Sequence, residues 1–198
     1  MLTDRIMSIA VGRSGSAMIA NVLRGIPGLT IIDDGPHQSY GVMEAKCVAR
    51  GIPVPPAMAF IRNPWEWQVS HWCWVNQHGP CFKGTFPEYI ARVQADPTNF
   101  SFRSLTHSWG WHGADSAQYI GRYENLYDDV VRFLLEIIPD LTTEAQIRTS
   151  IAASKWPGQG TFTDGRTHGD YRQYYDDETR RIVAELESTL IGRFGYEF

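Results

Sequence analysis

Short apolar runs alternate with longer amphipathic stretches along the chain, and each kind of pattern predicts a different element. The apolar or β-branched runs are typical of strands, and they lie at residues 6–11, 29–34, 57–61 and 118–126. Apolar residues at helical spacing, together with capping residues, predict helices at 16–23, 41–50, from Pro64 onward, and at 86–94, 126–138, 142–154 and 176–192.

The order of these elements predicts an α/β fold, because strands are repeatedly followed by helices. Such units favour a mainly parallel sheet, in which the carboxyl ends of the strands meet at one edge and ligands bind there. The length of 198 residues is that of one α/β domain, so we expect a single domain over 1–198.

Composition narrows the possible partners. With 43% hydrophobic and 20% charged residues the chain is ordinary globular protein, and its net charge of −4 argues against a broad nucleic-acid surface. A local basic pocket for a phosphorylated small molecule remains compatible with that charge. No apolar run is long enough to span a bilayer. The cysteines Cys47, Cys73 and Cys81 are odd in number and lack CxxC spacing, which favours a reducing compartment and predicts a cytoplasmic protein.

A narrow loop of small residues, GRSGSA at 12–17, separates the first strand from the first helix. Its backbone N–H groups and the helix N-terminus are suited to an anion, and Arg13 adds a fork-shaped cation that matches phosphate or sulfate oxygens. The loop is not a Walker A motif, since Gly15 is followed by Ser16 and Ala17 instead of Lys and Ser or Thr. A plain strand-to-helix turn remains the alternative.

Two further groups of polar residues follow strands. Arg62 stands where the strand 57–61 ends, Asn63 can cap the next helix, and Ser70 lies about two turns into it, so Arg62 and Ser70 can converge on a second anion. Asp33 and Asp34 end the strand 29–34 and are followed by His37. Their alternative role is that of an ordinary solvated turn.

The segment 79–116 is rich in Gly, Pro and aromatic residues around one predicted helix at 86–94. We expect it to wall a pocket for a second substrate, and the alternative is aromatic packing over a sheet edge. The residues concerned, in or beside the segment, are His78, Phe82, Phe86, Tyr89, His107, Trp109, Trp111 and His112. A long polar loop at 155–171 carries Arg166 and His168, with Arg172 directly after it, and loops of that length are usually functional or disordered.

Five motifs together resemble those of the PAPS-dependent sulfotransferases, over nearly the whole chain. GRSGSAM resembles the 5′-phosphosulfate loop, and RNPWEWQVS resembles the 3′-phosphate motif, in which an Arg and a Ser stand eight residues apart. GRYENL resembles RYEDL, RTSIAASK resembles TSFxxMK, and THGDYRQYYDDET resembles the GxxGDWKxxFTxE loop. The sequence departs from the family where Met18 replaces a tryptophan and where Asp164 occupies the usual Arg position before the last motif.

The resemblance implies an α/β three-layer sandwich with a mainly parallel central sheet flanked by helices, related to the P-loop NTPases. It implies transfer of a sulfuryl group from 3′-phosphoadenosine 5′-phosphosulfate (PAPS) to a hydroxyl or amine acceptor, with 3′-phosphoadenosine 5′-phosphate (PAP) as product and no metal. The cofactor-binding residues that it implies are Gly12, Arg13, Ser14, Gly15, Ser16, Ala17, Arg62, Ser70, Tyr123, Thr149, Ser150, Arg166, Thr167, His168 and Gly169.

Sulfuryl transfer is an in-line displacement that positioning and cations accelerate, so Arg13 is expected to stabilise the leaving phosphate. The acceptor also needs a base, for which His37 and Asp34 are the leading candidates. Glu44, His107 and the absence of a side-chain base remain open. The expected partners are the nucleotide donor and a small or modest-sized hydroxylated acceptor, with no nucleic acid. Two rival functions are a PAP-binding module without catalysis and a kinase-like phosphotransferase, which would need a loop Lys and a magnesium carboxylate.

Overall fold

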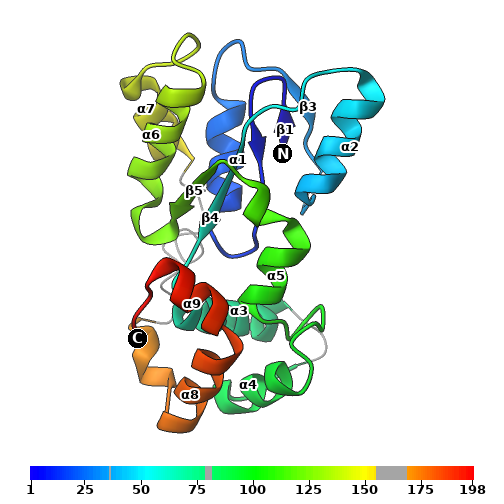
Figure 1. Ribbon diagram of the computed structural model, residues 1–198. Coiled ribbons are helices and arrows are strands. Elements are labelled where there is room, and N and C mark those ends of the chain that lie inside the picture. The colour runs from blue at the N-terminus through cyan, green and yellow to red at the C-terminus, as the bar shows by residue number, and fades with distance from the viewer. Residues whose placement is uncertain (36, 79–81, 155–168) are drawn as a thin grey trace. The chain divides into compact units, whose positions relative to one another are not determined.

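The computed structural model describes residues 1–35, 37–78, 82–154 and 169–198 of the chain (Figure 1). These residues form two compact units. Unit 1 holds the described residues of Met1–Ile61 and Gly110–Thr163, and unit 2 holds those of Arg62–Trp109 and Asp164–Phe198. Each unit therefore draws on two separate stretches of the chain.

Unit 1 contains a five-stranded sheet in the order β3-β1-β2-β4-β5. Its strands are β1 (Leu2–Thr3), β2 (Met7–Ser8), β3 (Ile31–Asp33), β4 (Ala57–Ile61) and β5 (Tyr119–Arg122). β1 pairs antiparallel with both β2 and β3, whereas β2–β4 and β4–β5 are parallel pairs. The sheet is thus mixed where we expected a mainly parallel one, because β1 runs against the other four strands.

The sequence patterns did not predict β1, which forms a tight hairpin with β2. The hydroxyl of Thr3 donates to the carbonyl oxygen of Ile6 at 2.8 Å and accepts from the Ile6 N–H at 2.8 Å. Strands of two residues are too short to show a periodic pattern of apolar and polar positions. The one local sequence signal for this hairpin is the Thr3 side chain, which bonds to the backbone of the turn.

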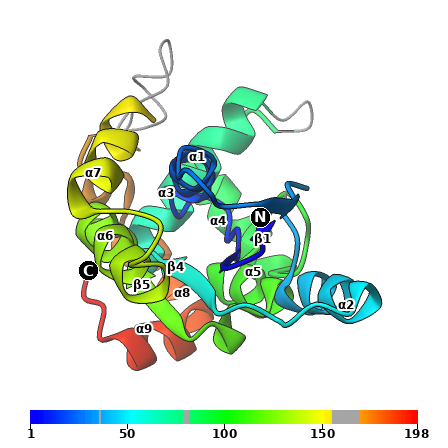
Figure 2. The ribbon, with the colours of Figure 1, turned by 90° about the horizontal axis from the view of Figure 1, so that it is seen from above.

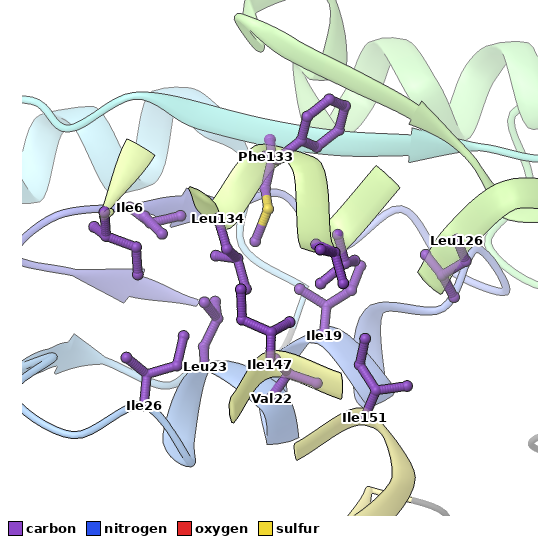
Figure 3. Packing of buried hydrophobic residues seen from close by; sticks show 14 of the residues in the cluster. Ile6, Ile19, Val22, Leu23, Ile26, Leu126, Phe133, Leu134, Ile147 and Ile151 are labelled. Atoms are coloured by element: carbon purple, nitrogen blue, oxygen red, sulfur yellow. The ribbon is translucent and has the colours of Figure 1, made fainter. Parts of the chain in front are cut away.

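The helices of unit 1 are α1 (Ser16–Arg24), α2 (Tyr40–Arg50), α6 (Leu126–Ile137) and α7 (Glu144–Ala153). α7 packs against both α1 and α6 (Figure 2). Figure 3 shows the resulting core, where Ile19 and Val22 of α1 approach Ile147 and Ile151 of α7 beneath Leu134 of α6. Burying each such side chain contributes about 1.5–3 kcal/mol, so this core fixes the position of α1 and of the loop before it.

Unit 2 is helical in the part that the structure describes. It contains α3 (Pro64–His78), α4 (Phe86–Ala95), most of α5 (Leu105–His112), α8 (Asp177–Leu186) and α9 (Ser188–Phe194). The sequence predicts α3, through Asn63 and Pro64, and α4, but it predicts no helix where α5 lies. The single helix expected at 176–192 is two helices that meet at Glu187.

Glu187 explains both differences, because its buried carboxylate caps α5. The carboxylate accepts hydrogen bonds from the N–H groups of Leu105 and Thr106, from the Thr106 hydroxyl and from Gln68 Nε2, at 2.6–2.8 Å. Burial raises the pKa of Glu187, and these hydrogen bonds oppose that rise. The chain turns inward at Glu187 to make these contacts, and the long helix is interrupted there.

We expect Glu187→Gln to destabilise the protein by about 2–4 kcal/mol, because an amide NH₂ would face N–H donors that the carboxylate now accepts. The melting temperature should fall by about 2–4 °C for each kcal/mol. Glu185→Gln is the matched control on α8: Glu185 is exposed and pairs with the exposed Arg181, so the loss of its charge should cost about 0.5 kcal/mol or less. Equal melting temperatures for the two variants would contradict the capping role.

Candidate functional site

The predicted phosphate loop lies between β2 and α1 in unit 1. Arg13 has φ +62° and Gly15 has φ +84°, so two residues of this short turn adopt the left-handed conformation. For Arg13 that conformation is strained, and such strain is concentrated at functional sites. Gly15 directly precedes Ser16, the first residue of α1, and no side chain caps this helix end.

Ser14 supplies the polar group that best fits an oxyanion. Its side chain is 2% exposed, and its Oγ has no hydrogen-bond partner among the described residues. Buried hydroxyls are almost always hydrogen-bonded, so the Ser14 hydroxyl, beside a helix N-terminus without a side-chain cap, is suited to bonding an oxyanion oxygen. The residues of this loop therefore fit a phosphate or sulfate group.

Gly15 is required by both conformation and space. A Cβ at this position would lie 2.4 Å from Cδ2 of Leu126, the first residue of α6, in a backbone conformation that L-residues rarely adopt. The loop is therefore held against the core helix α6.

We expect Gly15→Ala to destabilise the protein by about 1–3 kcal/mol, mainly through its positive φ. Gly12→Ala is the control within the same loop, because a Cβ there meets nothing within 4 Å and Gly12 has no positive φ. Thermal unfolding without ligand compares the two. A Gly15→Ala variant that is as stable as Gly12→Ala would show that the loop conformation costs nothing.

The residues expected near the adenine come from the elements around α1. Tyr123 is half-buried directly after β5 and packs against the core of unit 1. Ser150 lies near the C-terminal end of α1, with its Oγ 3.2 Å from where a Cβ on Gly25 would stand. The exposed Thr149 bonds through Oγ1 to the Ala145 carbonyl at 2.8 Å. Their contacts with a nucleotide stay a prediction.

Asp34 is engaged in an ion pair. Its Oδ2 accepts from Arg24 Nη2 at 2.7 Å and from Nε at 2.9 Å. Arg24 is the last residue of α1. The phosphate loop lies at the other end of α1, roughly 13 Å away along the axis of this nine-residue helix. Asp34, one of the two leading candidates for the base, is therefore engaged in an ion pair with Arg24.

His37 lies in the connection between β3 and α2, with φ +53° and an exposed side chain. Asp33 holds this connection: its Oδ1 accepts from the Gly35 N–H at 2.8 Å and from Gln38 Nε2 at 2.6 Å, and its Oδ2 accepts from Lys46. The Lys46 hydrogen bond, followed by those from Gly35 and Gln38, holds the pKa of Asp33 well below its usual range. Asp33 is thus a permanent anion that orders the segment carrying His37.

A second histidine lies beside His37. The ring centroids of His37 and His112 are 6.4 Å apart, and His112 also packs edge-on against Trp111 at 4.7 Å. Trp111 is 55% exposed, so this corner of unit 1 presents an accessible aromatic face and an accessible imidazole. Glu44, on α2, shares a hydrogen bond with Tyr40, and His107 lies on α5 in unit 2.

The predicted 3′-phosphate residues lie in unit 2. Arg62 directly follows β4, and the Oδ1 of Asn63 caps α3 by accepting from the N–H groups of Trp65 and Glu66 at 3.0 and 3.3 Å. Arg62 and Ser70 are both 1% exposed. Nη2 of Arg62 donates to Oε1 of Glu66 at 2.8 Å, a contact that the sequence analysis missed although Arg–Glu spacing of i,i+4 is a common ion-pair signal.

Of the residues expected in the cofactor loop, Gly169 is exposed and has φ +66°, whereas Arg166, Thr167 and His168 lie outside the described residues. The chain continues from Gly169 into Tyr171, whose ring packs edge-on against Phe198 at 5.8 Å. Arg172 pairs with Asp170 at 3.4 Å.

The aromatic residues expected to wall the acceptor pocket are mostly interior. Phe82, Phe86, Tyr89 and Trp109 are buried, and all of them lie in unit 2. Trp111 is largely exposed, and the side chain of His78 lies outside the described residues. The wall of an acceptor pocket stays a prediction.

The cysteines, possible metal ligands and possible membrane-spanning helices can be stated for the described part of the chain. Cys47 and Cys73 form no disulfide there, and Cys81 lies outside it. Within the same residues, no three His, Cys, Asp or Glu side chains are grouped as metal ligands would be. A search of the described helices finds none with the length and hydropathy that a bilayer crossing requires.

The fold is similar to that of a sulfotransferase. The protein is similar to the crystal structure of the mouse sulfotransferase SULT7A1 complexed with PAP, with a TM-score of 0.65 and 16% sequence identity over 95% of this chain and 84% of that chain. No protein-family model matches the sequence, and no curated protein matches it either.

Proposed function

We propose that the protein is a sulfotransferase that moves a sulfuryl group from PAPS to a hydroxyl or amine acceptor and releases PAP. The observation that carries the proposal is the loop before α1, where the buried Ser14 hydroxyl and a helix N-terminus without a side-chain cap are suited to an oxyanion. The likeness to a sulfotransferase complexed with PAP supports the choice of nucleotide.

The proposed nucleotide contacts follow the motifs. The loop Gly12, Arg13, Ser14, Gly15, Ser16 and Ala17 binds the 5′-phosphosulfate, and Arg62 and Ser70 bind the 3′-phosphate. Tyr123, Thr149 and Ser150 line the base, and Arg166, Thr167, His168 and Gly169 belong to the covering loop. A buried Arg62 beside the N-terminus of α3 supports an anion at the second position.

In the proposed reaction the acceptor oxygen or nitrogen attacks the sulfur and forms a new bond to it. The bond between sulfur and the bridging oxygen of the 5′-phosphate breaks, and PAP leaves with the electron pair. Arg13 stabilises the charge that develops on that oxygen. His37 takes the proton of the acceptor, which its accessible position and the rigid Asp33 network support.

For the acceptor we propose a small or modest-sized hydroxylated molecule. The exposed Trp111 beside His112 and His37 supports an acceptor with an apolar face, such as a phenol, a sugar ring or a lipid tail. The acidic net charge disfavours an anionic polymer. A metal-free reaction, a single domain and a cytoplasmic location remain parts of the same proposal.

The test is transfer from sulfur-labelled PAPS to panels of phenols, sugars, lipids and peptides. We expect labelled product from one of the small hydroxylated classes without added metal. Binding of PAPS with no turnover on any panel would favour the non-catalytic PAP-binding module. A strict magnesium requirement would revive the kinase-like alternative, and preferential turnover of an anionic polysaccharide would contradict the proposed acceptor.

A further inference from the structure

The ion pair at the start of α3 is exposed on one side only. Nη2 of Arg62 and Oε1 of Glu66 are 2.8 Å apart, and the side chain of Arg62 is 1% exposed whereas that of Glu66 is 19% exposed. A solute therefore reaches the pair from the Glu66 side.

The surroundings of Glu66 favour a negative charge. Glu66 lies in the first turn of α3, where the helix dipole is positive, and its N–H is bonded to Asn63 Oδ1 at 3.3 Å. The guanidinium of Arg62 adds a full positive charge at hydrogen-bond distance. These are the features of an anion site, and in this structure its anion is a side chain of the protein itself.

A carboxylate and a phosphate seek the same donors of an arginine. A 3′-phosphate that binds Arg62 must therefore meet Glu66, and two anions at contact distance repel strongly where solvent screening is weak. The carboxylate has to give up its contact with Nη2 or share it.

We propose that Glu66 is a built-in competitor of the nucleotide 3′-phosphate at Arg62 and so sets how tightly 3′-phosphorylated nucleotides are held. The proposal rests on the proposed function, because it takes PAP as the ligand. It also predicts opposite effects on the stability of the free protein and on its affinity for PAP. Removing the charge of Glu66 leaves the buried Arg62 less well neutralised and lowers the stability of the free protein, while it raises the affinity for PAP.

The test measures PAP binding to wild type and Glu66→Gln by calorimetry, with adenosine 5′-phosphosulfate as a ligand that lacks the 3′-phosphate. We expect Glu66→Gln to bind PAP about tenfold more tightly or better, to bind adenosine 5′-phosphosulfate with unchanged affinity, and to melt at a lower temperature without ligand. Glu88→Gln is the matched control, since Glu88 is also a first-turn glutamate of a helix in unit 2 but caps through Thr85. Its PAP affinity should equal that of wild type.

Each other result has a defined meaning. Unchanged or weaker PAP binding by Glu66→Gln would overturn the inference, because Glu66 would then be irrelevant or would position Arg62 for the ligand. If Glu66→Gln does not fold, Glu66→Asp withdraws the carboxylate by one methylene and should show a smaller gain in PAP affinity; no gain there would overturn the inference equally. A wild-type protein that does not prefer PAP to 5′-AMP, which differs from it only in the 3′-phosphate, would instead refute the assignment of Arg62 in the proposed function.

Discussion

Arg62→Ala should remove most of the extra thermal stabilisation that PAP gives over 5′-AMP or ATP. Binding to the native state raises the melting temperature by mass action, and only PAP offers a 3′-phosphate to Arg62. Losing a buried charge-assisted contact costs about 2–4 kcal/mol, which is a factor of tens to hundreds in affinity. The measurement is the ligand-induced shift within each variant, because Arg62→Ala also strips Glu66 of its partner and changes the starting stability.

The control for this experiment is Arg181→Ala. Arg181 is also an arginine of unit 2, but it is exposed and pairs with Glu178 and Glu185 on α8. Its variant should keep the wild-type preference for PAP. Equal shifts with ATP and PAP in wild type would refute the 3′-phosphate assignment altogether.

His37→Ala should lower kcat by about 10²- to 10⁴-fold while PAP affinity changes little, because a general base acts on the acceptor and not on the nucleotide. Asp34→Ala is compared in the same assay. We expect the larger loss in His37→Ala, because the Asp34 carboxylate is held by Arg24 at the end of α1 remote from the phosphate loop.

The two variants separate three outcomes. A larger loss in Asp34→Ala would make Asp34 the base and would require its pair with Arg24 to open. If both variants keep full activity, positioning and Arg13 carry the chemistry, and both catalytic assignments are wrong. A loss of kcat that comes with an equal loss of PAP affinity would indicate a disturbed fold.

Local signals explain which helices the sequence predicted. The capping boxes of Thr85 with Glu88 and of Thr143 with Gln146 each span four consecutive residues. α4 and α7 begin directly after Thr85 and Thr143, the N-cap residues. α5 has one such signal, the bond from the His107 N–H to Ser104 Oγ at 3.0 Å, but its main cap is Glu187, far along the chain. A pattern read in short windows does not detect a cap of that kind.

The candidate site also combines features that the local sequence predicts with features that depend on how distant elements pack. The sequence predicts the phosphate loop, because a strand, a glycine-rich turn and a helix follow one another along the chain. The structure adds the left-handed conformation of Arg13 and the burial of the Ser14 hydroxyl. The pairing of Asp34 with Arg24 and that of Asp33 with Lys46 depend on how β3 and α2 pack, which the sequence does not state. These pairings are what distinguish the two carboxylates from each other and from His37.

The interleaving of the two units determines when each can fold during synthesis on a ribosome. β1 to β4 emerge first, but the core that holds α1 needs Ile147 and Ile151 of α7, and the first stretch of unit 2 emerges between them. That stretch in turn lacks Glu187 until the end of the chain. A nascent chain that stops after Trp109 therefore carries two unfinished cores at once, with apolar surface open to chaperones and to aggregation.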